Sequence, residues 1–153
     1  MVADHEVVRR AVEALREVLG ERLVSAVLFG SRARGDDRPE SDWDLLVLAE
    51  GLPENPFDRS LFLKRIVPPE CRGAISFLAK SPKEFEAGLA SVYLDVALDG
   101  RILFDSSGYA AGRLRSLRRL IEEAGLYRER TESGDWWRWK QEPAYPWSLD
   151  WKE

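Results

Sequence analysis

The feature that most constrains the fold is a pair of short apolar runs, separated by a polar loop that carries glycine, proline and arginine. The first run is Leu23–Phe29 and the second lies in residues 43–48. A short run that is almost continuously apolar indicates a strand buried in the centre of a sheet. We therefore predict a central strand in the first run and a second strand directly after the loop.

The loop opens on Gly30 and Ser31, where the first run stops. Glycine allows a tight turn and a close approach of the backbone to a ligand. We expect residues 31–34 to form a helical turn, and backbone N–H groups at the start of a short helix can cradle a polyphosphate. Gly30 and Ser31 are therefore predicted to bind a nucleotide triphosphate, and Arg32 or Arg34 to neutralise phosphate charge. For the two arginines, a solvated loop is the alternative.

Two aspartates, Asp42 and Asp44, lie on either side of Trp43 at the start of the second run. Successive side chains of a strand point to opposite faces, so the two carboxylates would share one face with Cα atoms about 7 Å apart. This spacing suits one or two Mg²⁺ or Mn²⁺ ions, which prefer oxygen ligands and share them with substrate phosphates. We predict that Asp42 and Asp44 are catalytic metal ligands and that Trp43 packs beneath a helix. Two solvated carboxylates in a charged loop are the alternative.

At these residues the chain resembles the nucleotidyltransferase family related to DNA polymerase beta. The matching pattern is Gly30 and Ser31, ten intervening residues, then Asp42 and Asp44 on a strand. In its short length the chain is similar to the minimal nucleotidyltransferases, often encoded beside a small helical protein of the HEPN type. The resemblance implies Mg²⁺-dependent transfer of NMP from an NTP, foremost ATP, to a hydroxyl. In that branch the acceptor would be a tyrosine of the HEPN-type partner, and the chain would be the antitoxin.

One position departs from the family pattern. Active members usually carry a third acidic residue on the following strand, where it completes the metal site and often serves as the base. The strand expected at residues 73–78 has Ser76 at that position, and a hydroxyl neither binds Mg²⁺ as a carboxylate does nor accepts a proton at a useful pKa. Two interpretations stay open: an active transferase, and a weakly active or inactive nucleotide-binding module that acts by binding a HEPN-type partner.

The remaining sequence predicts an α/β fold. Amphipathic or capped segments indicate helices at residues 4–19, 57–67, 81–98 with a break near Gly88, and 109–126, and residues 101–104 indicate a fourth strand. We expect a small, mixed, twisted sheet of about four strands with helices packed mainly on one face, as in the nucleotidyltransferase fold.

The C-terminal segment is unusually rich in tryptophan. We divide the chain into a nucleotidyltransferase domain at residues 1–130 and a tail at residues 131–153. The tail carries Trp136, Trp137, Trp139, Trp147 and Trp151. So many large apolar side chains are not expected to stay in water, so the tail should dock on the domain or on a partner.

Composition excludes several classes of protein. The net charge of −4 disfavours broad nucleic-acid binding. The chain has no apolar run long enough to span a membrane, and acidic residues near the N-terminus disfavour a signal peptide. The single cysteine, Cys71, excludes an internal disulfide and is expected to be a small packed residue. We therefore expect a cytoplasmic protein with no membrane partner.

Overall fold

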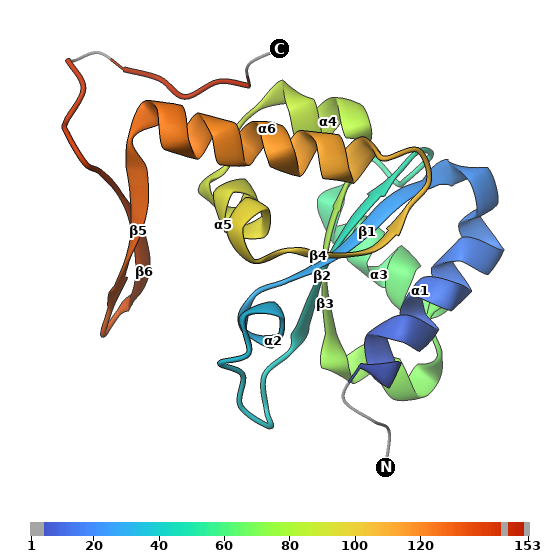
Figure 1. Cartoon of the computed structure of the whole chain (residues 1–153). Coiled ribbons are helices and arrows are strands. Elements are labelled where there is room, and N and C mark those ends of the chain that lie inside the picture. The colour runs from blue at the N-terminus through green and yellow to red at the C-terminus, as the bar shows by residue number, and fades with distance from the viewer. Residues whose placement is uncertain (1–4, 145–146, 152–153) are drawn as a thin grey trace.

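The sheet of this protein has four strands in the order β3–β2–β1–β4 (Figure 1). The computed structural model describes residues 5–144 and 147–151 of the chain. The strands are β1 (Leu23–Phe29), β2 (Trp43–Ala49), β3 (Ile75–Lys80) and β4 (Arg101–Asp105). β1 is antiparallel to both of its neighbours, β2 and β4, whereas β2 and β3 are parallel. The predicted α/β fold with a mixed sheet is confirmed.

Six α-helices lie in the described part of the chain, and several of their boundaries have a local cause. They are α1 (Glu6–Leu19), α2 (Ser31–Arg34), α3 (Pro56–Ile66), α4 (Pro82–Ala87), α5 (Ser91–Asp99) and α6 (Tyr109–Ala124). Asn55 caps α3 by accepting a hydrogen bond from the backbone N–H of Phe57 at 2.9 Å, and Pro56 takes the first helical position. The predicted break near Gly88 separates α4 from α5.

Helices cover both faces of the sheet, which corrects the prediction that they pack mainly on one face. On β2, Leu45 and Val47 belong to the core beneath α1 and α3, whereas Leu46 and Leu48 belong to the core beneath α4, α5 and α6 (Figure 1). All four side chains are at most 1% exposed. Because neighbouring side chains of a strand alternate between faces, both faces of β2 are apolar and each needs helical cover.

Two predictions about single side chains are confirmed. Trp43 is buried in the core layer of α1 and α3, and its ring meets the edge of the His5 ring with the centroids 5.8 Å apart. Cys71 is buried as a free thiol. Among the residues with described positions, no helix combines the length and the apolar character that crossing a membrane requires.

Residues 126–139 form a β-hairpin that was not predicted from the sequence. Its strands, β5 (Leu126–Thr131) and β6 (Gly134–Trp139), are antiparallel. α6 ends before the hairpin because Gly125 has a φ of 69°, a left-handed conformation that glycine adopts without strain. Along β6, Trp137 and Trp139 pack against the core, whereas Trp136 is more than half exposed.

The segment after the hairpin returns to α4. The Trp151 ring lies 5.2 Å from the ring of Phe85, and its indole N–H donates to the carbonyls of Phe85 and Gly88 at 3.1 and 3.0 Å. Trp147 meets the edge of Trp139 but stays half exposed. The tail thus contacts the rest of the chain, and the division at residue 130 stays a prediction.

α4 begins with a capping box. The Ser81 hydroxyl accepts a hydrogen bond from the backbone N–H of Glu84 at 3.1 Å, and the Glu84 carboxylate accepts one from the backbone N–H of Ser81 at 2.9 Å. The Glu84 carboxylate also lies 2.9 Å from the guanidinium of Arg59 on α3. The hydrogen bond from Ser81 and then that from Arg59 lower the pKa of Glu84 to about 2. Glu84 therefore connects α4 to α3.

The substitution Glu84→Gln is expected to lower the free energy of unfolding at neutral pH. Since the folded-state pKa of about 2 lies below the ordinary value of 4.5, the carboxylate stabilises the fold fully above pH 4.5 and loses this effect as the pH falls to about 2. Urea midpoints of the two proteins should therefore converge over this interval. Glu13→Gln, which removes an exposed ion pair with Arg9 on α1, is the control with little effect. A pH-independent difference for Glu84→Gln would contradict the prediction.

Candidate active site

The turn after β1 is built around Gly30. Its φ of 77° and ψ of −161° end the strand and start α2. The carbonyl of Gly30 accepts hydrogen bonds from the N–H groups of Ala33 and Arg34, each at 3.1 Å. No described side chain caps the N-terminus of α2, and the first N–H groups of a helix have no partner within the helix. The turn therefore leaves backbone donors for an anionic ligand, and the binding of a nucleotide by Gly30 and Ser31 stays a prediction.

The carboxylate of Asp44 packs directly against this turn. Asp44 is paired with Phe29 in the register of β1 and β2, which places it beside the next residue, Gly30. A Cβ added at Gly30 would lie 2.1 Å from Oδ2 of Asp44 and 3.1 Å from its Cγ. The Asp44 carboxylate thus occupies the space that a side chain at position 30 would fill. Because residue 30 is glycine, the carboxylate can contact the backbone of the turn directly.

The two predicted aspartates are close enough to interact. Asp42 is exposed just before β2 begins, and Asp44 is partly buried within it. Burial raises the pKa of Asp44, the negative charge of Asp42 raises it further, and the positive charge of Arg34 opposes the shift. Two ionised carboxylates this close repel each other, and a bound cation offsets that repulsion. The donor set fits a divalent ion that also takes phosphate oxygens as ligands.

Ser76 lies beside this pair. β2 and β3 pair in parallel, with Asp44 opposite Ser76, and the Ser76 side chain is exposed. The position next to Asp44 therefore carries a hydroxyl, as the sequence analysis expected. Within residues 5–144 and 147–151, no group of three or more histidine, cysteine, aspartate or glutamate side chains is arranged to hold a metal ion.

The two predicted arginines of the turn have different surroundings. The Arg32 guanidinium lies 4.5 Å from the centre of the Trp43 ring, donates to the Ser41 carbonyl at 3.2 and 3.0 Å, and pairs with Asp37 at 2.7 Å. Trp43 faces the opposite side of the sheet from Asp44. Arg32 thus holds the loop in front of Asp42, whereas Arg34 is the arginine whose charge acts on Asp44.

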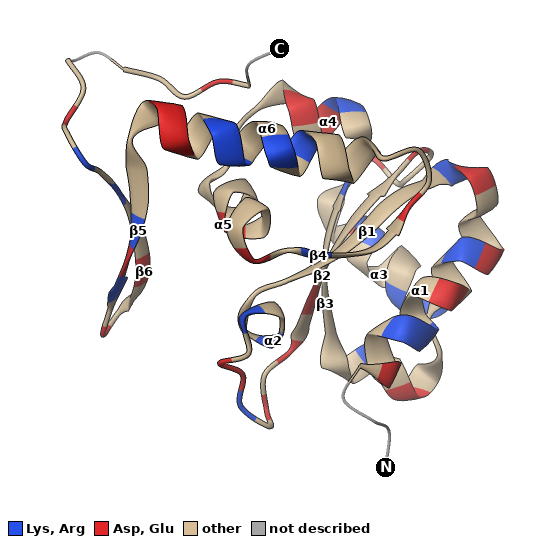
Figure 2. Cartoon of the chain, in the orientation of Figure 1, with Lys and Arg blue, Asp and Glu red and all other residues tan. Residues whose placement is uncertain are grey.

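Sequence reasoning missed the charged residues that surround Arg34. Basic and acidic residues both occur along the hairpin and in the loop after α2 (Figure 2). Arg34 pairs with Asp36 and with Asp99 at the end of α5, and hairpin arginines pair with the same two carboxylates. Trp137 and Trp139 alternate with Arg138 and Lys140, which is a local signal for the second strand of the hairpin. No local pattern predicts the ion pairs around Arg34.

The part of the chain that carries the turn and both aspartates matches a known family. Residues 13–87 match the family described as Polymerase beta, Nucleotidyltransferase. A 56-residue stretch is 43% identical to a protein of Methanocaldococcus jannaschii with the provisional name protein adenylyltransferase. That match covers 37% of this chain and 38% of the relative. The chain therefore matches well under half of the relative's length.

Solved structures with the same fold come from toxin–antitoxin complexes. A chain of one such complex, solved with AMP-PNP, superposes with a TM-score of 0.52 at 18% identity, over 75% of this chain and 90% of that chain. A chain of a mutant MntA–HpeT toxin–antitoxin pair gives a TM-score of 0.50 at 17% identity, over 73% and 87% of the two chains. At these identities the similarity establishes the fold alone.

Proposed function

Because this chain is a polymerase beta-like nucleotidyltransferase in residues 13–87, we propose that it transfers AMP from ATP to a hydroxyl group of a partner protein. The observation that carries the proposal is the contact between the Asp44 carboxylate and the Gly30 turn. This contact supports a role for Asp44 as a metal ligand next to backbone groups that would bind phosphate. The provisional name of the M. jannaschii relative supports a protein acceptor, and the AMP-PNP in the toxin–antitoxin neighbour supports ATP.

Each residue of the site has a role in this reaction. The backbone N–H groups of Gly30 and Ser31, with the Ser31 hydroxyl, hold the triphosphate. Asp42 and Asp44 would ligate Mg²⁺ or Mn²⁺, which when bound neutralises charge on the phosphate oxygens. Arg34 adds positive charge near the phosphates. Arg32 fixes the carbonyl of the residue before Asp42 and so positions that carboxylate.

The transfer exchanges one P–O bond for another. The acceptor hydroxyl oxygen bonds to the α-phosphorus of ATP while the bond from that phosphorus to the leaving pyrophosphate breaks. The acceptor loses its proton to solvent, because Ser76 stands where the family carries a carboxylate base. The proposed acceptor is a tyrosine of a HEPN-type partner, for which this chain would be the antitoxin.

A second function is favoured by Ser76 itself. With a hydroxyl beside Asp44, the site retains the elements for nucleotide and metal but lacks a base. A nucleotide-binding module of this kind would act by binding its HEPN-type partner. Trp136 and Trp147, both more than half exposed, would then be available as contacts, since interface energy is concentrated in such aromatic side chains.

One experiment separates the two functions. The purified chain is incubated with Mg²⁺ or Mn²⁺ and α-labelled ATP, alone and with a HEPN-type helical protein as the candidate acceptor. We expect label on the partner only when metal is present, and none after chelation with EDTA. Metal-dependent ATP binding without transfer to any acceptor would favour the binding module. A chain that binds no nucleotide in the presence of metal would contradict both functions.

A further inference from the structure

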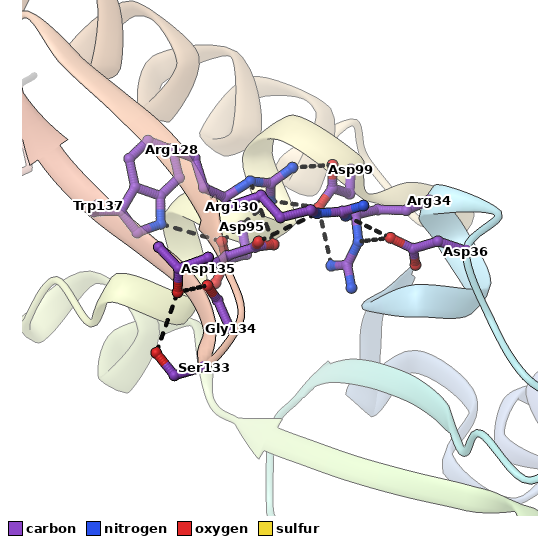
Figure 3. A network of polar contacts seen from close by, with 11 residues as sticks. Arg34, Asp36, Asp95, Asp99, Arg128, Arg130, Ser133, Gly134, Asp135 and Trp137 are labelled. Atoms are coloured by element: carbon purple, nitrogen blue, oxygen red, sulfur yellow. Dashed lines mark hydrogen bonds and ion pairs between the residues drawn. The ribbon is translucent and has the colours of Figure 1, made fainter.

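Arg34 lies between two carboxylates that it shares with arginines of the hairpin (Figure 3). Its Nε donates to Oδ2 of Asp36 at 3.2 Å, and its Nη1 donates to Oδ2 of Asp99 at 3.4 Å. The same oxygen of Asp36 accepts from Arg130 at 2.6 Å, and the same oxygen of Asp99 accepts from Arg128 at 2.6 Å. In both cases the hairpin arginine is the closer partner.

The negative charge of Asp99 is compensated by an arginine of the hairpin. Asp99 is the last residue of α5, where the helix dipole disfavours a negative charge, and its side chain is only 10% exposed. Arg128 compensates with two hydrogen bonds, to Oδ2 at 2.6 Å and to Oδ1 at 2.9 Å. Paired hydrogen bonds of this kind fix both the position and the orientation of a carboxylate. The hydrogen bond to Asp99 is also the main reason that the pKa of Arg128 is raised.

The hairpin is held to α5 by a second carboxylate. Asp95 accepts from Arg128 at 3.2 Å and from the indole N–H of Trp137 at 3.1 Å (Figure 3). Arg128 and Trp137 are paired across β5 and β6, so both strands of the hairpin contact the same helix. The geometry of the Asp99 carboxylate therefore follows from the docking of the whole hairpin.

We propose that Asp99 is a positioning residue for Arg34, and that Arg128 holds Asp99 in the orientation that fixes the Arg34 guanidinium at the end of α2, the helix that begins at the Gly30 turn. This inference rests on the proposed function, because it assumes that the positive charge of Arg34 acts on the phosphates of the bound nucleotide. The hairpin arginines make shorter contacts with Asp36 and Asp99 than Arg34 does. We infer that these carboxylates fix the position of the Arg34 guanidinium without neutralising it. Its positive charge then stays available to the phosphates of the nucleotide.

This inference adds residues to the site that the family match does not contain. Arg34 and Asp36 lie within residues 13–87, whereas Asp99, Arg128 and Arg130 come from α5 and the hairpin. α5 and the hairpin then complete the nucleotide site. A chain shortened after α4 would keep the aspartates and the turn but lose the anchor of Arg34.

The test measures ATP binding by the full chain in the presence of Mg²⁺, by calorimetry, alongside transfer kinetics. We expect Asp99→Asn to weaken ATP binding about tenfold, since a charge-assisted hydrogen bond contributes about that factor. KM should rise by a similar factor and kcat should change less. Asp99→Glu should restore part of the affinity. Combined with Arg34→Ala, the Asp99→Asn change should have no further effect, because both act through the same guanidinium.

Two further variants separate positioning from folding. Arg128→Lys keeps the charge but loses the paired geometry, and it should weaken ATP binding in a folded chain with cooperative thermal unfolding. Arg138→Gln is the matched control, because it removes the ion pair with Glu129 on the other face of the same hairpin, and it should leave ATP binding unchanged.

The outcomes separate this inference from the proposed function. If the Asp99→Asn variant binds ATP as tightly as the unmodified chain, or more tightly, Asp99 does not position Arg34. The proposed function would still stand. The same holds if Asp99→Asn still weakens binding when Arg34 is alanine. An unmodified chain that binds no ATP with Mg²⁺ would overturn both.

Discussion

The double substitution Asp42→Asn/Asp44→Asn is expected to abolish transfer of label from ATP while the chain stays folded. Asparagine cannot replace an ionised carboxylate as a ligand for Mg²⁺, and loss of metal-based charge stabilisation corresponds to about 1000-fold in rate, or ~4 kcal/mol. The fold should not suffer, because the pKa of Asp44 is raised by its burial and by Asp42. An ionised Asp44 therefore opposes folding at neutral pH, and the neutral variant should unfold at the same or a higher temperature.

Transfer rates with the partner protein and thermal unfolding curves check both halves of this prediction. Glu40→Gln is the control, because it removes an exposed negative charge from the same loop and should keep both rate and stability. A double variant that retains a tenth or more of the transfer rate would refute the assignment of these aspartates. A double variant that unfolds at a much lower temperature would show that their role is structural.

The substitution Gly30→Ala is expected to impair both stability and transfer. The added Cβ would lie 2.1 Å from Oδ2 of Asp44, and a φ of 77° with a ψ of −161° is a conformation almost confined to glycine. The strain should lower the free energy of unfolding by about 2–3 kcal/mol. Moving Asp44 away from the turn should slow transfer about 100-fold, the effect of a displacement near 1 Å at a reacting centre.

Gly35→Ala separates the contact with Asp44 from the cost of the backbone conformation. Gly35 also has a left-handed φ, of 88°, but an added Cβ there meets nothing within 4 Å. This variant should lose about 1 kcal/mol of stability and keep its transfer rate. Chemical denaturation and the labelled-ATP assay measure the two quantities. If both variants slow transfer equally, the approach of Asp44 to Gly30 is not what the reaction requires.

The sequence alone determined the elements whose causes are local. Alternation and run length predicted β1 and β2, and capping residues such as Asn55 and Ser81 predicted where α3 and α4 begin. The spacing from Gly30 to Asp44 predicted that the turn and the two aspartates belong to one site, whereas their direct contact follows from the pairing of Phe29 with Asp44. These signals involve residues within about fifteen positions of one another.

Only the tertiary structure decided which partners the remaining side chains have. Arg32 and Arg34 are indistinguishable in sequence, yet one packs on Trp43 and the other reaches Asp99, which is 65 positions away. Arg130 pairs with Asp36 across 94 positions. Such contacts depend on how both faces of the sheet are covered and where the hairpin docks. Those features follow from the packing of the whole core. The spacing of apolar residues within a short stretch of sequence does not determine them.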